Sequence, residues 1–157
     1  PGPLFHLDRY RIHPAGRPQV SQGKYGMLQA LLAQKPGFDL RPAPMAAQHT
    51  IELAHDPSYV KQFLWGELPA AAMRCIGFPW SQQLAQRSLA SVGGTIGAAR
   101  QALATGSEAA LGGGTHHALR AEGGGYANPL EQSVLAHFHT YRSALEVFSD
   151  RVIAVIG

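Results

Sequence analysis

Short apolar runs alternate with longer helical stretches along this chain, and that alternation constrains the fold more than any other feature. Apolar runs bounded by turn residues predict strands at residues 3–8, 38–41, 108–114 and 151–157. Apolar residues at helical spacing predict helices at residues 23–35, 79–106 and 129–150, with two short helices within 50–68. Strands and helices in this order favour an α/β fold with a mostly parallel sheet.

The helix expected at 79–106 contains a glycine pair, Gly93–Gly94, although glycine lowers helix propensity. A close approach of this helix to the sheet would explain why the pair is tolerated. The helix is expected to stop at Thr105–Gly106, since glycine commonly follows the last helical turn. The two short helices are expected to break at Asp56–Pro57, because the residue before a proline avoids the helical region.

Two other segments carry clear patterns. The helix at 23–35 is expected to place Leu28, Leu31 and Leu32 on one face. The final run, RVIAVIG at 151–157, is continuous and rich in β-branched residues, which is typical of a strand buried on both faces.

The length suits a single domain over residues 1–157, and with 45% hydrophobic and 15% charged residues the chain can form a core. The net charge of +3 is spread without a basic block, so we expect no direct contact with nucleic acid. The start of the chain does not read as a signal peptide, and no apolar run approaches the roughly 20 residues that span a bilayer. The single cysteine, Cys75, allows no internal disulfide and is expected to be a small packed residue. We therefore expect a cytoplasmic protein without a membrane partner.

A glycine-rich turn with two adjacent histidines, GGGTHH, follows the strand expected at 108–114. Ligands in parallel α/β sheets bind at the carboxyl ends of strands, so this turn is the leading site candidate. A histidine near its ordinary pKa can give or take a proton at neutral pH, and two neighbours can divide these roles. His116 and His117 are therefore candidate catalytic residues.

The histidine pair also allows other interpretations. A bare pair of histidines is usually a solvated or hydrogen-bonded turn. A zinc pair is poorly supported, because adjacent residues rarely chelate one ion and no HExxH is present. Phosphate binding is disfavoured, since no lysine follows the glycines and Glu122 would repel a phosphate.

The longer stretch GGGTHHALRAEGGGY resembles the signature of the histone deacetylase superfamily, which includes acetoin-utilisation proteins and acetylpolyamine amidohydrolases. The stretches AHDPSYVKQFLWGEL, IGFPWS and SVGGTIGAARQAL also resemble this family, in the same order. GKYG and FPWS are most similar to the class IV branch and its bacterial relatives. The resemblance covers residues 4–126.

This resemblance implies an arginase/deacetylase-like three-layer α/β fold and a zinc-dependent amidohydrolase that removes acetyl groups from acetyl-lysine or acetylated amines such as polyamines. In such enzymes zinc polarises the acetyl carbonyl, and a bound water attacks it. By the same resemblance, His117 is the general base, and His116 is the electrostatic partner or proton donor. Gly125 and Tyr126 would bind substrate by lining the tunnel for the acetyl-lysine stem.

The chain departs from the family pattern after Tyr126, where Ala127 stands in place of the family's cysteine and the family's Asn-Asp pair is missing. The family's aspartate and histidine zinc ligands follow the next strand, and 151–157 resembles that strand without those ligands. We therefore expect a truncated fold in which zinc belongs to the family but has no ligands in this chain, and no activity for the chain alone.

Two further hypotheses stay open at this point. One is a non-catalytic deacetylase-like module that acts in binding or assembly, because an apolar edge strand at 151–157 would favour self-association through the sheet edge. The other is an α/β domain whose histidine turn has no role.

Overall fold

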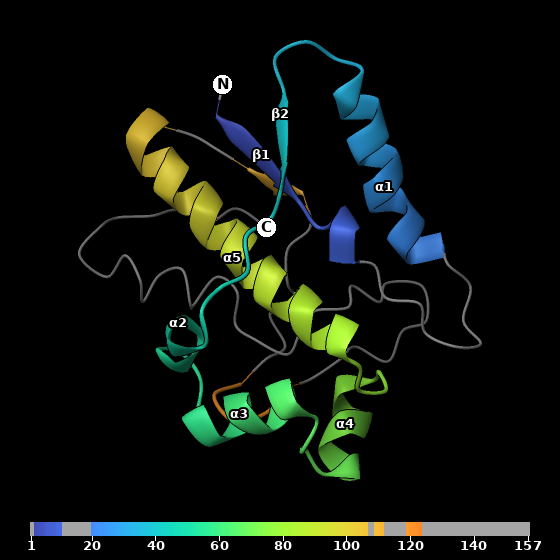
Figure 1. Ribbon diagram of the computed structural model, residues 1–157, viewed down its shortest axis with the longest axis vertical. Coiled ribbons are helices and arrows are strands. Elements are labelled where there is room, and N and C mark those ends of the chain that lie inside the picture. Colours follow the sequence, from blue (N-terminus) through green and yellow to red (C-terminus); the bar gives the residue numbers. More distant parts are fainter. Residues whose placement is uncertain (1, 11–19, 107–108, 112–118, 124–157) are drawn as a thin grey trace.

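The computed structural model describes residues 2–10, 20–106, 109–111 and 119–123 of the chain (Figure 1). Their elements follow in the order β1 (Pro3–His6), a 3-10 turn η1 (Asp8–Tyr10), α1 (Val20–Ala33), β2 (Asp39–Pro42), α2 (Gln48–Glu52), α3 (Pro57–Trp65), α4 (Ala70–Ile76), α5 (Gln82–Thr105) and β3 (Ala110–Leu111). No helix of these described ranges combines the length and the apolar character needed to cross a membrane.

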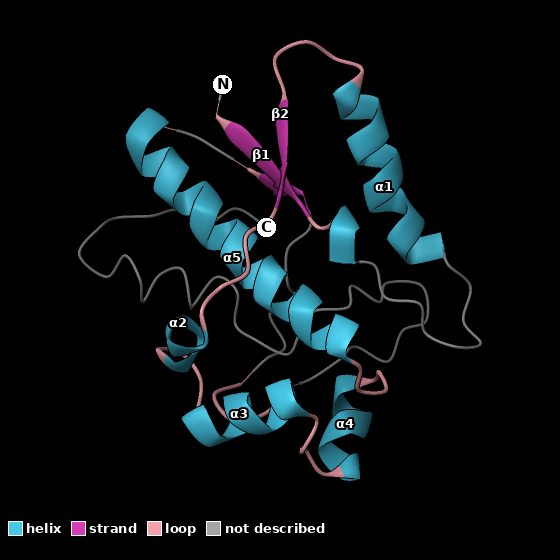
Figure 2. Ribbon diagram, viewed as in Figure 1, coloured by secondary structure: helices cyan, strands magenta, loops and turns pink. Residues whose placement is uncertain are grey.

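The three described strands form one parallel sheet in the order β2-β1-β3 (Figure 2). β1 pairs with β2 from Pro3 opposite Asp39 onward, and with β3 through His6 opposite Leu111. A parallel pair needs a crossover connection, and a helix supplies it between each pair of strands. The expected α/β fold with a parallel sheet is therefore confirmed for this part of the chain.

Helices cover both faces of this sheet. Successive side chains of a strand point to opposite faces. Phe5 packs against α5, because a methyl group on Gly97 would lie 2.8 Å from its ring. The next residue, His6, is within hydrogen-bonding distance of Gln29 on α1. The sheet thus lies between α1 and α5, which makes the three layers seen in Figure 1.

The close approach expected of the glycine pair is found in α5. A methyl group on Gly93 would lie 2.0 Å from the Pro44 carbonyl oxygen, and one on Gly94 would lie 3.1 Å from Cβ of Ala43. Only glycine lets the helix lie this close to the segment that follows β2. The predicted close approach to the sheet is confirmed for Gly94, which faces Phe5 of β1, whereas Gly93 contacts the segment that follows β2.

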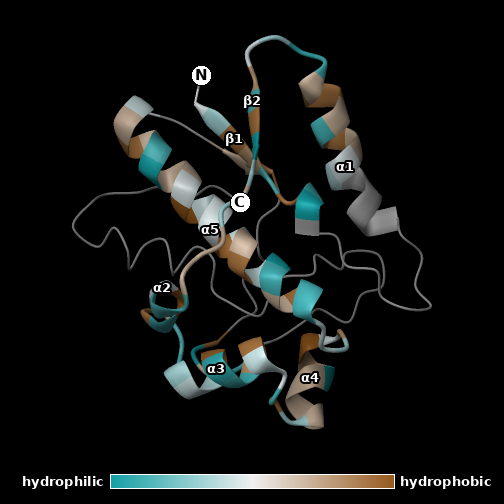
Figure 3. Cartoon of the chain, in the orientation of Figure 1, coloured by the Kyte–Doolittle hydropathy of each residue, from teal (hydrophilic) through white to brown (hydrophobic). Residues whose placement is uncertain are grey.

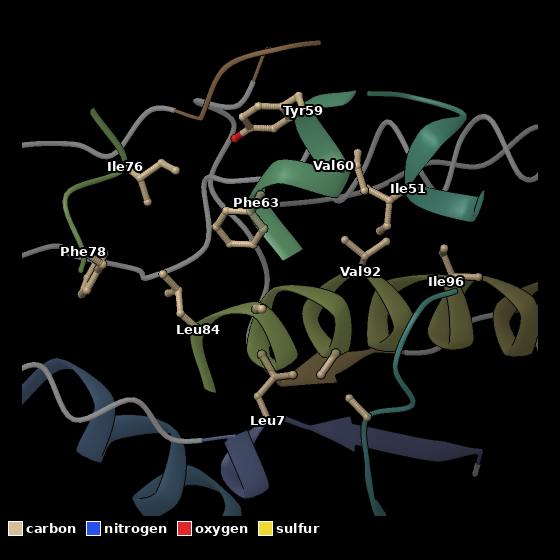
Figure 4. Close-up of a cluster of buried hydrophobic side chains, with 13 residues drawn as sticks. Leu7, Ile51, Tyr59, Val60, Phe63, Ile76, Phe78, Leu84, Val92 and Ile96 are labelled. Atoms are coloured by element: carbon tan, nitrogen blue, oxygen red, sulfur yellow. The ribbon is translucent and has the colours of Figure 1, made fainter. Parts of the chain in front are cut away.

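The core lies between α5 and the helices α2, α3 and α4. Val92 and Ile96 of α5 point toward Ile51 and Val60 (Figure 4). Phe63 is fully buried in the same cluster. α5 therefore packs with its glycine side on the sheet and with larger apolar side chains on the other helices.

Most of the expected boundaries agree with the structure. α5 ends at Thr105 with Gly106 in the left-handed conformation, and its start is capped by the Ser81 hydroxyl, which accepts from the Leu84 N–H at 3.1 Å. α2 and α3 are separated at Asp56–Pro57 as expected. The first strand is shorter than expected and ends at His6, because the chain turns into η1.

Three details differ from the sequence analysis or go beyond it, and the expectation for Cys75 was wrong. Residues 70–76 form the helix α4, which no pattern had indicated. Cys75 on this helix is exposed rather than packed. On α1, Leu28 and Leu31 are 41% and 58% exposed, so the apolar face expected there is only partly covered. Figure 3 shows hydrophobic colouring along the described part of α1 and on most of α4.

The helix expected at 129–150 and the strand expected at 151–157 lie outside the described residues.

Candidate functional site

The carboxyl ends of β1 and β3 lie side by side at one edge of the sheet, since His6 pairs with Leu111. The histidine turn follows β3 directly in the sequence. Ligands of parallel α/β sheets bind at this edge. The four predicted site residues, His116, His117, Gly125 and Tyr126, themselves lie outside the described residues.

The described segment 119–123, which follows the histidine turn, is fixed to the corner between α2 and α3. The Asp56 N–H donates to the Arg120 carbonyl oxygen at 2.8 Å, and His55 Nδ1 lies 3.2 Å from the same oxygen. Because a carbonyl can only accept, Nδ1 of His55 carries the proton in this bond. Leu119 donates to the Glu122 carbonyl at 2.8 Å and closes the segment into a turn. Residues on both sides of the histidine pair are therefore held: Leu111 by its pairing in the sheet and Arg120 by its bond to the α2–α3 corner.

Local sequence explains why this corner is rigid. The Asp56 carboxylate accepts from the Tyr59 N–H at 3.0 Å and caps the first turn of α3. Pro57 occupies the first helical position, where no N–H is needed. His55 is fully buried and packs near the Tyr59 ring, with 6.2 Å between ring centres.

A cavity of about 480 Å³ lies beside this anchor, between α3, α4 and residues 121–123. Glu122 lines it, and together with burial its charge raises the pKa of the Tyr59 phenol, with burial the larger cause. Tyr59 is therefore a neutral phenol over the physiological range. The cavity wall on α4 is mostly apolar, and Cys75 forms part of it.

His6 lies at the carboxyl end of β1 and is 9% exposed. Gln29 Nε2 donates to its Nε2 at 3.3 Å, and its Nδ1 has no hydrogen-bond partner among the described residues. Burial lowers the pKa of His6, and the nearby Asp8 carboxylate only partly opposes this. The ring is therefore neutral at pH 7.

Arg87 brings a buried cation to the same end of β1. Its Nη1 donates to the Leu7 carbonyl at 3.4 Å, and its guanidinium lies 6.0 Å from the centre of the Tyr25 ring. Burial lowers the pKa of Arg87, while Tyr25 and Asp8 act in the opposite direction. Arg87 therefore links α5 and α1 to the residue that follows β1, at the carboxyl edge of the sheet.

The described residues do not form a zinc site. Within the ranges that the structure describes, no three histidine, cysteine, aspartate or glutamate side chains gather closely enough to hold a metal ion. The described residues therefore do not provide ligands for the expected zinc ion.

Sequence reasoning missed the cavity and the anchor of residues 119–123. The Asp56–Pro57 pair predicts a helix break, and the same pair is also a helix-start signal. The bond from Asp56 to Arg120 joins two distant segments, and no local pattern reveals it.

Comparison with known proteins identifies the family. A family model described as the histone deacetylase domain matches residues 17–144. An uncharacterized protein of Picosynechococcus sp. is 46% identical over 76 residues, which cover 48% of this chain and 25% of that protein. The crystal structure of an HDAC homolog from Aquifex aeolicus is similar with a TM-score of 0.63 and 18% identity, over 94% of this chain and 41% of that one.

At 18% identity the structural likeness shows the fold, and the expected deacetylase-like α/β architecture is confirmed by it. The chain spans about a quarter of the length of the curated relative and 41% of the length of the solved one. The family model, in contrast, runs over most of the chain and includes the histidine turn. The chain belongs to the histone deacetylase domain family.

Proposed function

We propose that this chain contributes the histidine-bearing part of a zinc-dependent amidohydrolase that removes acetyl groups from acetyl-lysine or acetylated amines. The family match over residues 17–144 supports this, because it includes His116, His117, Gly125 and Tyr126. The observation that supports the proposal most is that described residues on both sides of the histidine pair are held in place. β3 ends at the ligand-binding edge of a parallel sheet, and Arg120 is bonded to the α2–α3 corner.

In this proposal His117 accepts a proton from the attacking water, and His116 supplies positive charge or a proton to the leaving amine. A histidine is suited to both tasks at neutral pH. Gly125 and Tyr126 line the passage for the acetyl-lysine stem. The aromatic ring packs on its methylene groups, and the glycine allows close approach of the backbone.

The zinc in this proposal is supported by family membership alone, because the described residues offer no metal site. The chemistry assigned above to the two histidines is proton transfer. We expect binding of an acetyl-lysine peptide to perturb these histidines whether or not the chain turns substrate over by itself.

The test combines binding with turnover. An acetyl-lysine peptide is titrated into ¹³C-histidine-labelled chain, and the signals of His116 and His117 are assigned with alanine variants. Shifts in these two signals, absent with the unacetylated peptide, are expected. Acetyl release is measured in parallel with added zinc, in wild type, in His117→Ala and in the control His49→Ala, which changes an exposed histidine of α2. Unperturbed histidines together with no acetyl release would contradict the proposal.

Self-association through a sheet edge stays a prediction. The strand expected at 151–157 lies outside the described residues. Among the described strands, β2 forms an edge, and this edge carries the exposed ion pair between Arg41 and Asp39 at 2.6 Å and ends at Pro42. Charges and proline blunt such edges, so pairing through β2 is disfavoured.

A further inference from the structure

The cavity beside segment 119–123 has two unlike walls. Leu68, Pro69, Ala71 and Ala72, from α4 and the turn before it, give it an apolar wall. Polar residues of α3, its capping residue and the 119–123 segment form the polar wall: Asp56, Ser58, Tyr59, Gln62 and Glu122. A volume of about 480 Å³ is within the usual range of about 300–1,000 Å³ for small-molecule sites.

The polar wall is negatively charged. Asp56 and Glu122 are carboxylates, and no basic side chain is among the described residues that line the cavity. Asp56 accepts the Tyr59 N–H with its Oδ1 oxygen, and a carboxylate has about four lone-pair sites. The charge of Glu122 reaches into the site, since it contributes to the raised pKa of the buried Tyr59 phenol. The arrangement repels anions and accepts hydrogen bonds.

We propose that this cavity binds a primary alkylammonium group, such as a lysine side chain, with its methylene stem on the apolar wall of α4 and its nitrogen beside Glu122 and Asp56. An ammonium group has three donors and no acceptor, which complements two carboxylates. The long apolar stem of lysine packs on apolar surface while its head stays near charge and water. A ligand with a neutral or anionic head group can pack its stem on the apolar wall but cannot form an ion pair with the two carboxylates.

The site lies close in sequence to the residues assigned above to the substrate passage, since Glu122 and Gly123 precede Gly125 and Tyr126. A substrate with a free lysine near its acetyl-lysine could occupy both. In that role the cavity rests on the proposed deacetylase function. Binding of an alkylammonium group at the cavity needs neither metal nor turnover, so the two proposals can fail separately.

Cys75 provides a specific reporter, because it is the single cysteine of the chain, is exposed and lines the cavity. The rate of its alkylation by neutral iodoacetamide is measured with increasing hexylammonium, hexanol or hexanoate. These three probes share a six-carbon stem and differ in head-group charge. We expect saturable slowing with hexylammonium, weaker slowing with hexanol and none with hexanoate.

The carboxylate contribution is tested in Glu122→Gln. The side chain is exposed, so the apparent Kd for hexylammonium should rise by about two- to fivefold. Glu67→Gln removes the same charge from an exposed position that is not among the described lining residues, and it should bind as wild type does. Asp56→Asn is the second variant, because it keeps a capping oxygen for α3 while it removes the charge. Circular dichroism verifies that each variant is folded.

The outcomes separate clearly. Equal slowing by all three probes, no slowing by hexylammonium, or an unchanged Kd in both Glu122→Gln and Asp56→Asn would each overturn the proposal. A peptide with one free lysine and the polyamine spermidine are then compared as ligands. Stronger protection of Cys75 by the peptide is expected, and protection by spermidine alone would overturn the assignment to lysine. Hexylammonium binding together with unperturbed histidines and no acetyl release would reject only the deacetylase proposal.

Discussion

Replacing Gly93 with alanine tests the close contact between α5 and the chain that follows β2. The added methyl group would lie 2.0 Å from the Pro44 carbonyl oxygen and 2.7 Å from the Ala46 nitrogen. Both neighbours are backbone atoms, so no side-chain rotation relieves the overlap. The Ala46 N–H is itself bonded to the Leu89 carbonyl of α5 at 3.0 Å, which fixes this segment against the helix.

Two opposing terms decide the magnitude. Alanine in a helix interior is favoured over glycine by about 1 kcal/mol. Overpacking a tight contact costs about 1–3 kcal/mol, and loss of the bond from Ala46 to Leu89 costs about another 1 kcal/mol. We expect Gly93→Ala to lower the free energy of unfolding by about 2 kcal/mol as the net of these terms.

The assay is urea unfolding followed by circular dichroism at 222 nm. Gly94→Ala is the matched control in the same helix, because its methyl group would lie 3.1 Å from the Ala43 Cβ and need only a small shift. It should stay within about 1 kcal/mol of wild type, since the propensity gain offsets a mild contact. If Gly93→Ala were as stable as wild type, the argument that glycine is required for this contact would be refuted.

Three further substitutions test other parts of the structure. Asp56→Ala removes the cap that accepts the Tyr59 N–H and should lower the free energy of unfolding by about 1 kcal/mol, whereas Asp56→Asn should retain most of the stability of the wild type. Equal urea midpoints for Asp56→Ala and the wild type would contradict the capping role. Trp80→Phe loses the indole N–H bond to the Phe63 carbonyl at 2.7 Å and should also cost about 1 kcal/mol, measured in the same way. Burial lowers the pKa of His6 below the unfolded value of 6.5, so the unfolded state binds more protons and stability should fall as the pH drops below about 6.5 toward the folded pKa. Urea midpoints between pH 8 and pH 5 should decline less steeply in His6→Gln, and parallel profiles would show that another group is responsible.

Regular patterns made much of the fold predictable from sequence. The alternation of strands and helices indicated the parallel sheet, since parallel neighbours need a crossover connection, which is usually a helix. The Thr105–Gly106 boundary and the Asp56–Pro57 break follow from backbone preferences that act locally. The role of the Gly93–Gly94 pair was also predictable, because two glycines lower the propensity of a long helix and close packing compensates for that cost.

Other features depend on contacts that no local pattern encodes. α4 spans only Ala70–Ile76, which is too short for a clear helical period. Cys75 is a residue type that is usually buried, but it lies on the exposed side of this helix. The site was predictable mainly through the resemblance to a family, and the bond from Asp56 to Arg120 connects segments that are distant in sequence.

That bond makes one backbone amide a reporter on the segment beside the candidate site. The Asp56 amide hydrogen is held by the Arg120 carbonyl, so it exchanges with solvent deuterium only when residues 119–123 detach from the α2–α3 corner. The Val60 amide, which donates to the Asp56 carbonyl inside the first turn of α3, exchanges when the helix itself opens. When the Asp56 amide exchanges faster than the Val60 amide, its protection factor gives the free energy that holds this segment in place, independently of any metal or substrate.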